Sequence, residues 1–239
     1  EGRWCYYSID PDSAEAVSAL FQSLASSRQR ERSSEIRCEC RQRATAKINS
    51  HDLDCMGSEW ITNYYTSDPH FGHANIIKLC NRPFGTVEEM DHALIDNWNA
   101  RVHRDDHVYV VGDFSFRSAR PVSDYLDKLA GHKHLIIGNH DGSWMRNFNL
   151  DAYFESVDNE LMIVDRNRHV VMNHYPLMTF PRKSWLVYGH IHNDKPASYW
   201  PVLKTYGHAL NASVEVNGYM PVTLDELITN NASWRSDEA

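Results

Sequence analysis

Five short segments of the sequence combine aspartate, asparagine and histidine in patterns that suit metal chemistry. They are Asp68-Pro69-His70, Gly112-Asp113, Gly138-Asn139-His140-Asp141, Asn173-His174 and Gly189-His190-Ile191-His192. Carboxylate, amide and imidazole ligands without a thiolate suit manganese, iron, zinc or nickel ions better than they suit a structural zinc finger. A single Asp or His is more often a helix cap or a satisfied polar residue, so the hypothesis of a metal site rests on the five segments together.

Each segment follows a stretch that is expected to form a β-strand. The stretches are "ITNYYTSD", "HVYVVGD", "HKHLIIGNHD", the second half of a hairpin in "ELMIVDRNRHVVMNHYP", and "WLVYGHIH". Ligands of open α/β sheets gather at the carboxyl ends of the strands, so the segments are expected to converge. Side chains two residues apart on an extended chain point the same way. Residues 68 and 70, and residues 190 and 192, are therefore expected to face one centre, and Pro69 is expected to hold Asp68 in an extended conformation.

The region from position 58 onward alternates strand-like and helix-like runs. Helices are expected over "VEEMDHALIDNWNARV", Pro121 to Leu129 and Leu224 to Ile228, and a further strand pair is expected around Asn217-Gly218. The early part has the βαβ pattern and the late part is mostly β. These patterns predict an α/β domain.

In this order, the D-x-H, GD, GNHD, isolated His and GHxH motifs resemble those of the calcineurin-like metallophosphoesterase superfamily. The resemblance spans residues 58–232, and "TSDPHFGHANIIKLCNRPF" looks like a small bacterial and phage branch. No single motif is specific, whereas the five in order are. The resemblance implies a four-layer α/β/β/α sandwich of two mixed β-sheets flanked by helices, with a dimetal site at one edge.

The resemblance also implies a role for each matching residue. Asp68, His70 and His192 would hold one metal ion, Asn139, His174 and His190 would hold the second, and Asp113 would bridge both. A hydroxide bridging the ions would attack phosphorus, and His140 would protonate the leaving group. The implied protein is a metal-dependent phosphoesterase with two divalent ions. Manganese is the first expectation, and iron, zinc and nickel are the alternatives.

The chain departs from the motifs of protein Ser/Thr phosphatases, which carry GDxxDRG and GNHE. Phe116 stands where those enzymes have the Asp that supports the catalytic His, and the third motif ends in Asp141. A protein phosphatase of that kind is therefore not expected. Arg117 keeps the Arg position and is a candidate phosphate contact. Arg82 would either contact phosphate or pin a loop, and His73 would either border the pocket or cap the helix that starts after it.

Composition limits the partners of the chain. The net charge is −8, and stable DNA binding needs clustered Lys and Arg, so it is not expected. A phosphate-ester small molecule or a nucleotide still fits, because bound metal ions reverse the local field. Monoester and diester hydrolysis both remain open.

No apolar run reaches the ~20 residues of a membrane span. Four of the five cysteines precede position 56, which favours a reducing compartment and a cytoplasmic location.

Residues 1–57 are expected to form an N-terminal appendage to a metallophosphoesterase domain at 58–239. The first 25 residues resemble the wing strand and C-terminal helix of ArsR-type winged-helix repressors, and a polar linker follows. One interpretation is a remnant of an upstream gene, with the enzyme starting at Met56. The alternative function is a non-catalytic metal-binding scaffold or DNA-linked regulator with a repressor-like head. The helix-turn-helix is absent from that head, and the ligand set with His140 favours the enzyme.

Overall fold

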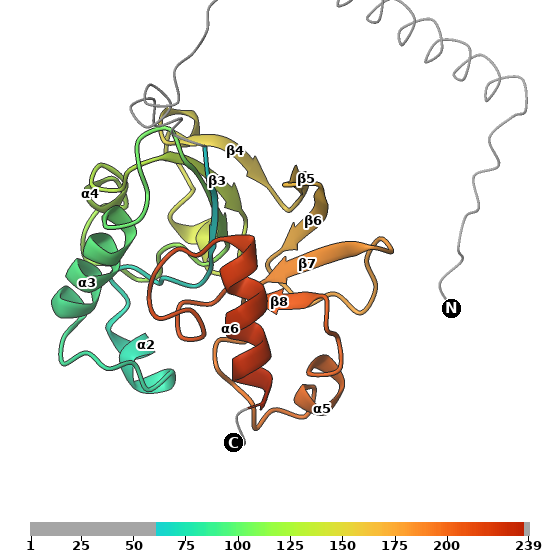
Figure 1. Cartoon of the computed structure of the whole chain (residues 1–239). Helices are drawn as coiled ribbons and strands as arrows, with labels where there is room; N and C mark the ends of the chain where they lie inside the picture. Colours follow the sequence, from blue (N-terminus) through green and yellow to red (C-terminus); the bar gives the residue numbers. More distant parts are fainter. Residues whose placement is uncertain (1–60, 237–239) are drawn as a thin grey trace, which may run out of the picture. The chain divides into compact units, whose positions relative to one another are not determined.

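The computed structural model describes residues 61–236, which form two four-stranded sheets (Figure 1). The first sheet consists of β1 (Asn63–Thr66), β2 (His107–Val111), β3 (His132–Ile136) and β4 (Phe154–Asp158), in that order. The second consists of β5 (Glu160–Asp165), β6 (Arg168–Asn173), β7 (Ser184–Tyr188) and β8 (Ala209–Asn211). The predicted repressor-like segment and linker lie outside the described residues.

Strand direction differs between the two sheets. The four strands of the first sheet pair in parallel, and an isolated antiparallel bridge joins Tyr65 of β1 to Val222. In the second sheet, β5 and β6 form the predicted antiparallel hairpin, and the other pairs are parallel. Helices flank the two sheets, so the predicted α/β class and layered architecture are confirmed.

Alternating side chains build the core between and outside the sheets. On β2, Val108 and Val110 pack against the outer helices, whereas Tyr109 and Val111 face the second sheet. On β6, Val170 and Met172 face the first sheet. Side chains of a strand point alternately to its two faces, and both faces of these strands are covered. The strands therefore read as nearly continuous apolar runs.

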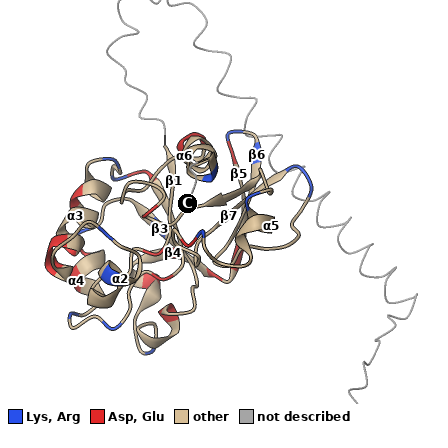
Figure 2. Cartoon of the chain, turned by 90° about the horizontal axis from the view of Figure 1, so that it is seen from below, with Lys and Arg blue, Asp and Glu red and all other residues tan. Residues whose placement is uncertain are grey.

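Three helices cover the outer face of the first sheet: α2 (Ala74–Leu79), α3 (Val87–Asn99) and α4 (Ser123–Leu126). The Thr86 side chain caps α3 by accepting a hydrogen bond from the Glu89 N–H (3.1 Å). Met90, Leu94 and Trp98 are buried at helical spacing. Acidic residues are frequent along α3, including Glu88 and Glu89 in its first turn (Figure 2).

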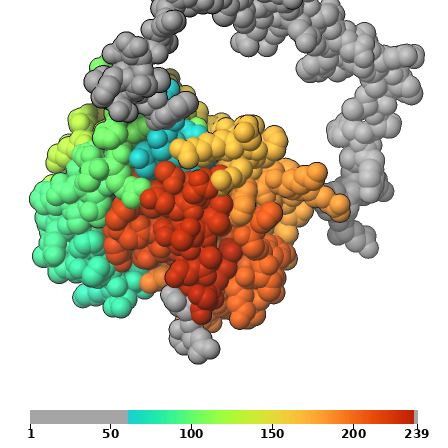
Figure 3. All heavy atoms as spheres, viewed as in Figure 1, coloured from blue at the N-terminus to red at the C-terminus, as the bar shows by residue number. Residues whose placement is uncertain are grey.

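The outer face of the second sheet packs against α5 (Trp200–Leu203) and the end of α6 (Leu224–Ser236). Helix α6 also contacts β1, and its surface fills the space between the first sheet's helices and the second sheet (Figure 3). It is longer than the predicted closing helix. The buried Asn231 amide bonds both the N–H and the carbonyl of Asn211, and this anchors the extra turns.

Three local predictions were wrong. The helix predicted from Pro121 is α-helical only over Ser123–Leu126. The strand β4 was not predicted, and the short 3₁₀ helices η1 (Asp141–Ser143) and η2 (Leu150–Ala152) precede it. Of the strand pair predicted over residues 209–223, the first strand is found as β8, but it pairs with β7, and the described residues form no hairpin around Asn217-Gly218. There the buried Asn217 amide donates to the Asn211 and Ser213 carbonyls, which folds the chain inward.

No helix among residues 61–236 is both long enough and apolar enough to cross a membrane.

Two methionines on paired strands test the core between the sheets. Met172 is fully buried and Met162 is 52% exposed. We expect Met172→Ala to lower the free energy of unfolding by about 2–5 kcal/mol, because it removes buried atoms and leaves a cavity. Met162→Ala should change it by no more than about 0.5 kcal/mol. Urea unfolding measures both, and equal effects would contradict this packing.

Candidate metal centre

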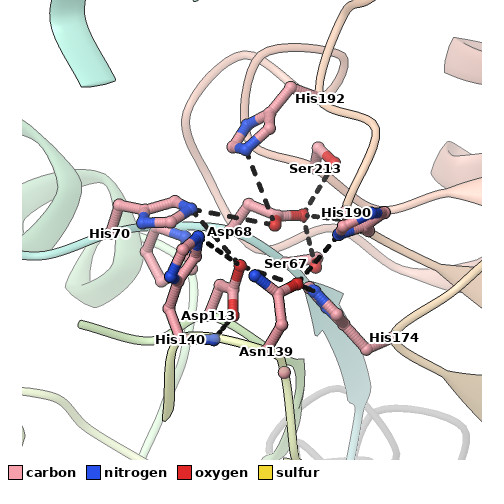
Figure 4. A network of polar contacts seen from close by, with 12 residues as sticks. Ser67, Asp68, His70, Asp113, Asn139, His140, His174, His190, His192 and Ser213 are labelled. Atoms are coloured by element: carbon pink, nitrogen blue, oxygen red, sulfur yellow. Dashed lines mark hydrogen bonds and ion pairs between the residues drawn. The ribbon is translucent and has the colours of Figure 1, made fainter. Parts of the chain in front are cut away.

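Loops after β1, β2, β6 and β7 bring two carboxylates and three imidazoles together (Figure 4). The Asp113 Oδ2 atom lies 3.6 Å from His70 Nε2 and 3.5 Å from His174 Nε2. The Asp68 Oδ1 atom lies 4.0 Å from His70 Nε2 and 3.8 Å from His192 Nε2. Hence the Asp68, His70 and Asp113 side chains all point into one space.

A second group of donors meets on the other side of Asp113. The Asn139 Oδ1 atom lies 2.9 Å from His174 Nε2 and 2.9 Å from His190 Nδ1. Asp113 thus touches a member of each ligand set that the family resemblance implied. The structure brings all seven predicted ligands to this one centre.

The donor atoms fit a bound cation. Asp68 Oδ1 and His70 Nε2 are buried and have no hydrogen-bond partner. A buried polar atom without a partner costs about 1–3 kcal/mol, and a metal ion would supply the missing partner. Groups of donors close enough to share an ion are Asp68–His70–His192 and Asp68–Asp113–His174.

The pKa values of His70 and Asp113 fit coordination directly. Burial lowers the pKa of His70 well below its usual value, so its imidazole is neutral and can coordinate. Burial alone would raise the pKa of Asp113, but its contacts with the His174 ring and the His140 N–H lower the pKa to about 2. Asp113 is therefore a carboxylate at neutral pH.

At His174 and His192 burial lowers the pKa, but the Asp113 and Asp68 carboxylates outweigh it and raise the pKa to about 9 and about 11. A bound cation would displace those protons.

The backbone at the ligands is left-handed, and the predicted extended conformation is wrong. The φ angles are 56° at Asp68, 52° at His70, 71° at His190 and 48° at His192. Such residues cost about 1–3 kcal/mol each and persist only where their surroundings hold them. The Asp68 N–H donates to the Gly112 carbonyl (3.0 Å), and this contact outweighs the extended preference of a residue before proline.

The backbone at Gly138 lies so close to Asp113 that no side chain fits between them. A Cβ atom on Gly138 would lie 2.3 Å from Asp113 Oδ1 and 2.4 Å from the Asp113 nitrogen. The buried Asp141 carboxylate joins the same two loops by accepting hydrogen bonds from the N–H groups of Gly138, Asp113 and Phe114 (2.8 Å each). Only glycine permits this contact between the second and third motifs.

Two serines that the sequence analysis missed orient Asp68. The Ser67 and Ser213 hydroxyls donate to Asp68 Oδ2 at 2.7 and 2.9 Å, and the His190 N–H donates to the same oxygen (2.9 Å). The other oxygen, Oδ1, is left facing the centre. Ser67 directly precedes a motif residue, so its position was a signal, whereas Ser213 reaches the site only through the turn after β8.

Glu215 is a further supporting residue that was missed. Its Oε1 atom lies 3.0 Å from His192 Nδ1 and 2.7 Å from Arg82 Nη2. Burial would raise the pKa of Glu215, but the bond to His192 and the Arg82 charge lower the pKa to about 2. A carboxylate behind a ligating imidazole fixes the ring and its tautomer.

Arg82 acts here as a pin between loops. Its guanidinium is fully buried and donates to the carbonyls of Asp68 (2.7 Å) and Pro69 (2.8 Å) as well as to Glu215. It thereby ties the first motif to the segment that supports His192. Because the Arg82 side chain is fully buried and its donors contact protein groups, it supports the ligands and fits the predicted role of holding a loop.

The other predicted contacts border the centre. His140 is 35% exposed at its side chain, and its Nε2 atom lies 4.0 Å from Asp113 Oδ2. Phe116 packs on the His140 ring (4.0 Å between centroids) and on His73 (5.0 Å). His73 stands at the start of α2 without capping it through its side chain, and its ring lies 5.3 Å from that of His70. Arg117 is exposed and lies over the Phe116 ring.

A model of the calcineurin-like phosphoesterases matches residues 64–231. The chain therefore belongs to the calcineurin-like phosphoesterase family. An uncharacterised protein of Methanocaldococcus jannaschii is 38% identical over 169 residues, which are 69% of this chain and 88% of that protein. The gene 66 protein of Mycobacterium phage L5 is 37% identical over 36% of this chain and 41% of its own length.

A solved structure has a similar fold. It is a protein of unknown function from Aquifex aeolicus, 26% identical, with a TM-score of 0.56 over 71% of this chain and 98% of that one. Family membership and the candidate ligand groups support metal-dependent hydrolysis of phosphate esters as the general class of activity.

Glu215→Gln tests the support behind His192. We expect it to weaken the affinity for the metal ion that His192 would hold by about 10–100-fold, because the imidazole loses its carboxylate partner. Glu226→Gln is the matched control, since Glu226 pairs with Arg101 at a half-exposed site. Titration with Mn²⁺ below the unfolding temperature measures the affinity. Equal affinity in both variants would show that Glu215 does not position a ligand.

Proposed function

We propose that the protein hydrolyses phosphodiesters with two divalent metal ions. The observation that carries the proposal is the contact of Asp113 with both donor groups, through His70 on one side and His174 on the other. Family membership supports the reaction class. The two-ion centre and the diester substrate are what the proposal adds.

Each ion would take ligands from one donor group, and Asp113 would serve both. The first group is Asp68, His70 and His192, and the second is Asn139, His174 and His190. Manganese is the first candidate, with iron, zinc and nickel as alternatives, since these ions accept mixed carboxylate and imidazole ligands. When bound, such ions lower the pKa of water and polarise phosphoryl oxygens.

His140 is the proposed general acid. It is the half-exposed imidazole beside Asp113, and its backbone N–H bonds Asp113 Oδ1 (2.8 Å). Its ring is held by Phe116 rather than by a carboxylate. The ring can therefore give a proton to the oxygen of a leaving group, a role worth about 10²–10⁴ in rate.

The surroundings of the centre favour a diester over a monoester. A hollow of about 520 Å³ is lined by His190 and His192 together with Leu79 and Tyr199. Another, of about 440 Å³, is lined by Ser143, whose hydroxyl donates to the His140 carbonyl (3.2 Å). A phosphodiester carries a substituent on each side of phosphorus, and each hollow has room for one.

The test is an assay of the full chain, stripped of metal and then resupplied with Mn²⁺. We expect turnover of bis-p-nitrophenyl phosphate to return with the metal and to exceed that of p-nitrophenyl phosphate. Asp113→Asn should abolish it, since the carboxylate would serve both ions. No turnover with Mn²⁺, Fe²⁺, Zn²⁺ or Ni²⁺ despite bound ions would refute the proposal.

His140→Ala tests the acid role. We expect the variant to keep its metal ions and to lose about 10²–10⁴-fold in rate on an alkyl ester, which needs protonation of its leaving oxygen. The loss on a nitrophenyl ester should be much smaller. His132→Ala, an exposed histidine paired with Glu155, is the control. Equal losses on both esters would rule out proton donation by His140.

A further inference from the structure

The hollow beyond His140 carries cationic and aromatic side chains that the metal centre does not use. It measures about 440 Å³, and its lining includes Arg117, Arg120, Ser143, Trp144 and Phe148. Basic groups beside aromatic rings suit a ligand that is both anionic and planar.

The position of the hollow relates it to one side of the reaction. The Ser143 hydroxyl on its wall donates to the His140 carbonyl (3.2 Å). Phe116 also links His140 to the hollow. Its ring packs on the His140 ring and lies under the guanidinium of Arg117, which lines the hollow. His140 and His190 lie on opposite sides of the centre (Figure 4). Residues that contact His140 therefore also border this hollow or contact its lining.

The two arginines are free to meet an anion. Both are exposed, and in residues 61–236 neither guanidinium takes part in an ion pair. Burial raises the pKa of the Asp91 carboxyl and of the Tyr125 hydroxyl, and the Arg120 charge partly offsets both shifts. In a chain of net charge −8, two adjacent unpaired guanidinium groups form a local site for a phosphate, which arginine binds with several N–H donors.

The aromatic wall is fixed in place. The Trp144 Nε1–H donates to Asp141 Oδ1 (2.8 Å), and the Trp144 and Phe148 rings pack edge to face with centroids 5.6 Å apart. Both side chains are partly buried and line the hollow. Such a wall offers a planar ring an apolar surface without further ordering of side chains.

We propose that this hollow binds a nucleotide unit of the leaving group, with its phosphate at Arg117 and Arg120 and its base against Trp144 and Phe148. The orientation rests on the proposed function. In the reaction, the oxygen of water forms the new bond to phosphorus, and the bond from phosphorus to the nucleotide oxygen breaks. That oxygen leaves with the proton from His140, and the proton from water restores His140. The substrate class is thus an oligonucleotide or a dinucleotide.

Binding tests the subsite independently of turnover. Isothermal titration of the metal-loaded full chain compares AMP with inorganic phosphate and with ribose 5-phosphate. We expect AMP to bind most tightly, and Arg120→Glu to weaken AMP by about tenfold, as for one reversed charge-assisted contact. Arg146→Glu is the control, because Arg146 is also exposed but does not line the hollow.

Arg120→Lys keeps the charge and should retain most of the affinity for AMP. Identical behaviour of Arg120→Glu and Arg146→Glu would overturn the phosphate contact. Equal affinities of the wild type for AMP and ribose 5-phosphate would overturn the base contact.

Kinetics separates this subsite from the proposed function. The ratio of kcat/KM for the dinucleotide pApA to that for bis-p-nitrophenyl phosphate should fall about tenfold in Arg120→Glu. It should stay at the wild-type value in Arg146→Glu. An unchanged ratio in Arg120→Glu would overturn the subsite while leaving diester hydrolysis intact. If the wild type fails on bis-p-nitrophenyl phosphate, the proposed function fails and the AMP titration still decides the subsite.

Discussion

Two buried carboxylates, Asp68 and Asp113, share one end of this molecule with imidazoles of which His70 is held neutral by burial. A buried charge is tolerated only when it is paired and hydrogen-bonded. Two serine hydroxyls and the His190 N–H satisfy one oxygen of Asp68, but the other has no hydrogen-bond partner. These buried carboxylates need a cation, and the surrounding loops are arranged so that their donor atoms can share one.

The surrounding loops hold the ligands in place at a cost in backbone strain. Left-handed residues recur at the ligands, and each is held by contacts from other loops. The buried pair of Arg82 and Glu215 joins the first motif to the support of His192, while Asp141 joins the second motif to the third. Removing one partner of a buried ion pair leaves an uncompensated charge. These contacts connect the loops that carry the ligands to one another without an ion or a substrate.

Local patterns predicted the elements but not the contacts between them. The strand ends that carry Asp68, Asp113 and His174 followed from apolar runs bounded by polar motifs. Parallel pairing of β1 and β2 brought the two carboxylates together. His174 comes from the second sheet, and its ring lies against the Val111 carbonyl of β2. Ser213 and Glu215 were missed because Asn217-Gly218 is typical of a hairpin turn, whereas the Asn217 amide is buried against the backbone.

Long-range contacts also decided the backbone at the first motif. The preference of a residue before proline for extended geometry gave way at Asp68 to a hydrogen bond with Gly112, 44 residues away in sequence.

The most direct test of the central claim is anomalous diffraction from crystals of the Mn²⁺-loaded chain. Two peaks should flank the Asp113 carboxylate, one beside His70 and His192 and the other beside Asn139 and His190. A single peak, or peaks away from Asp113, would contradict the two-ion centre.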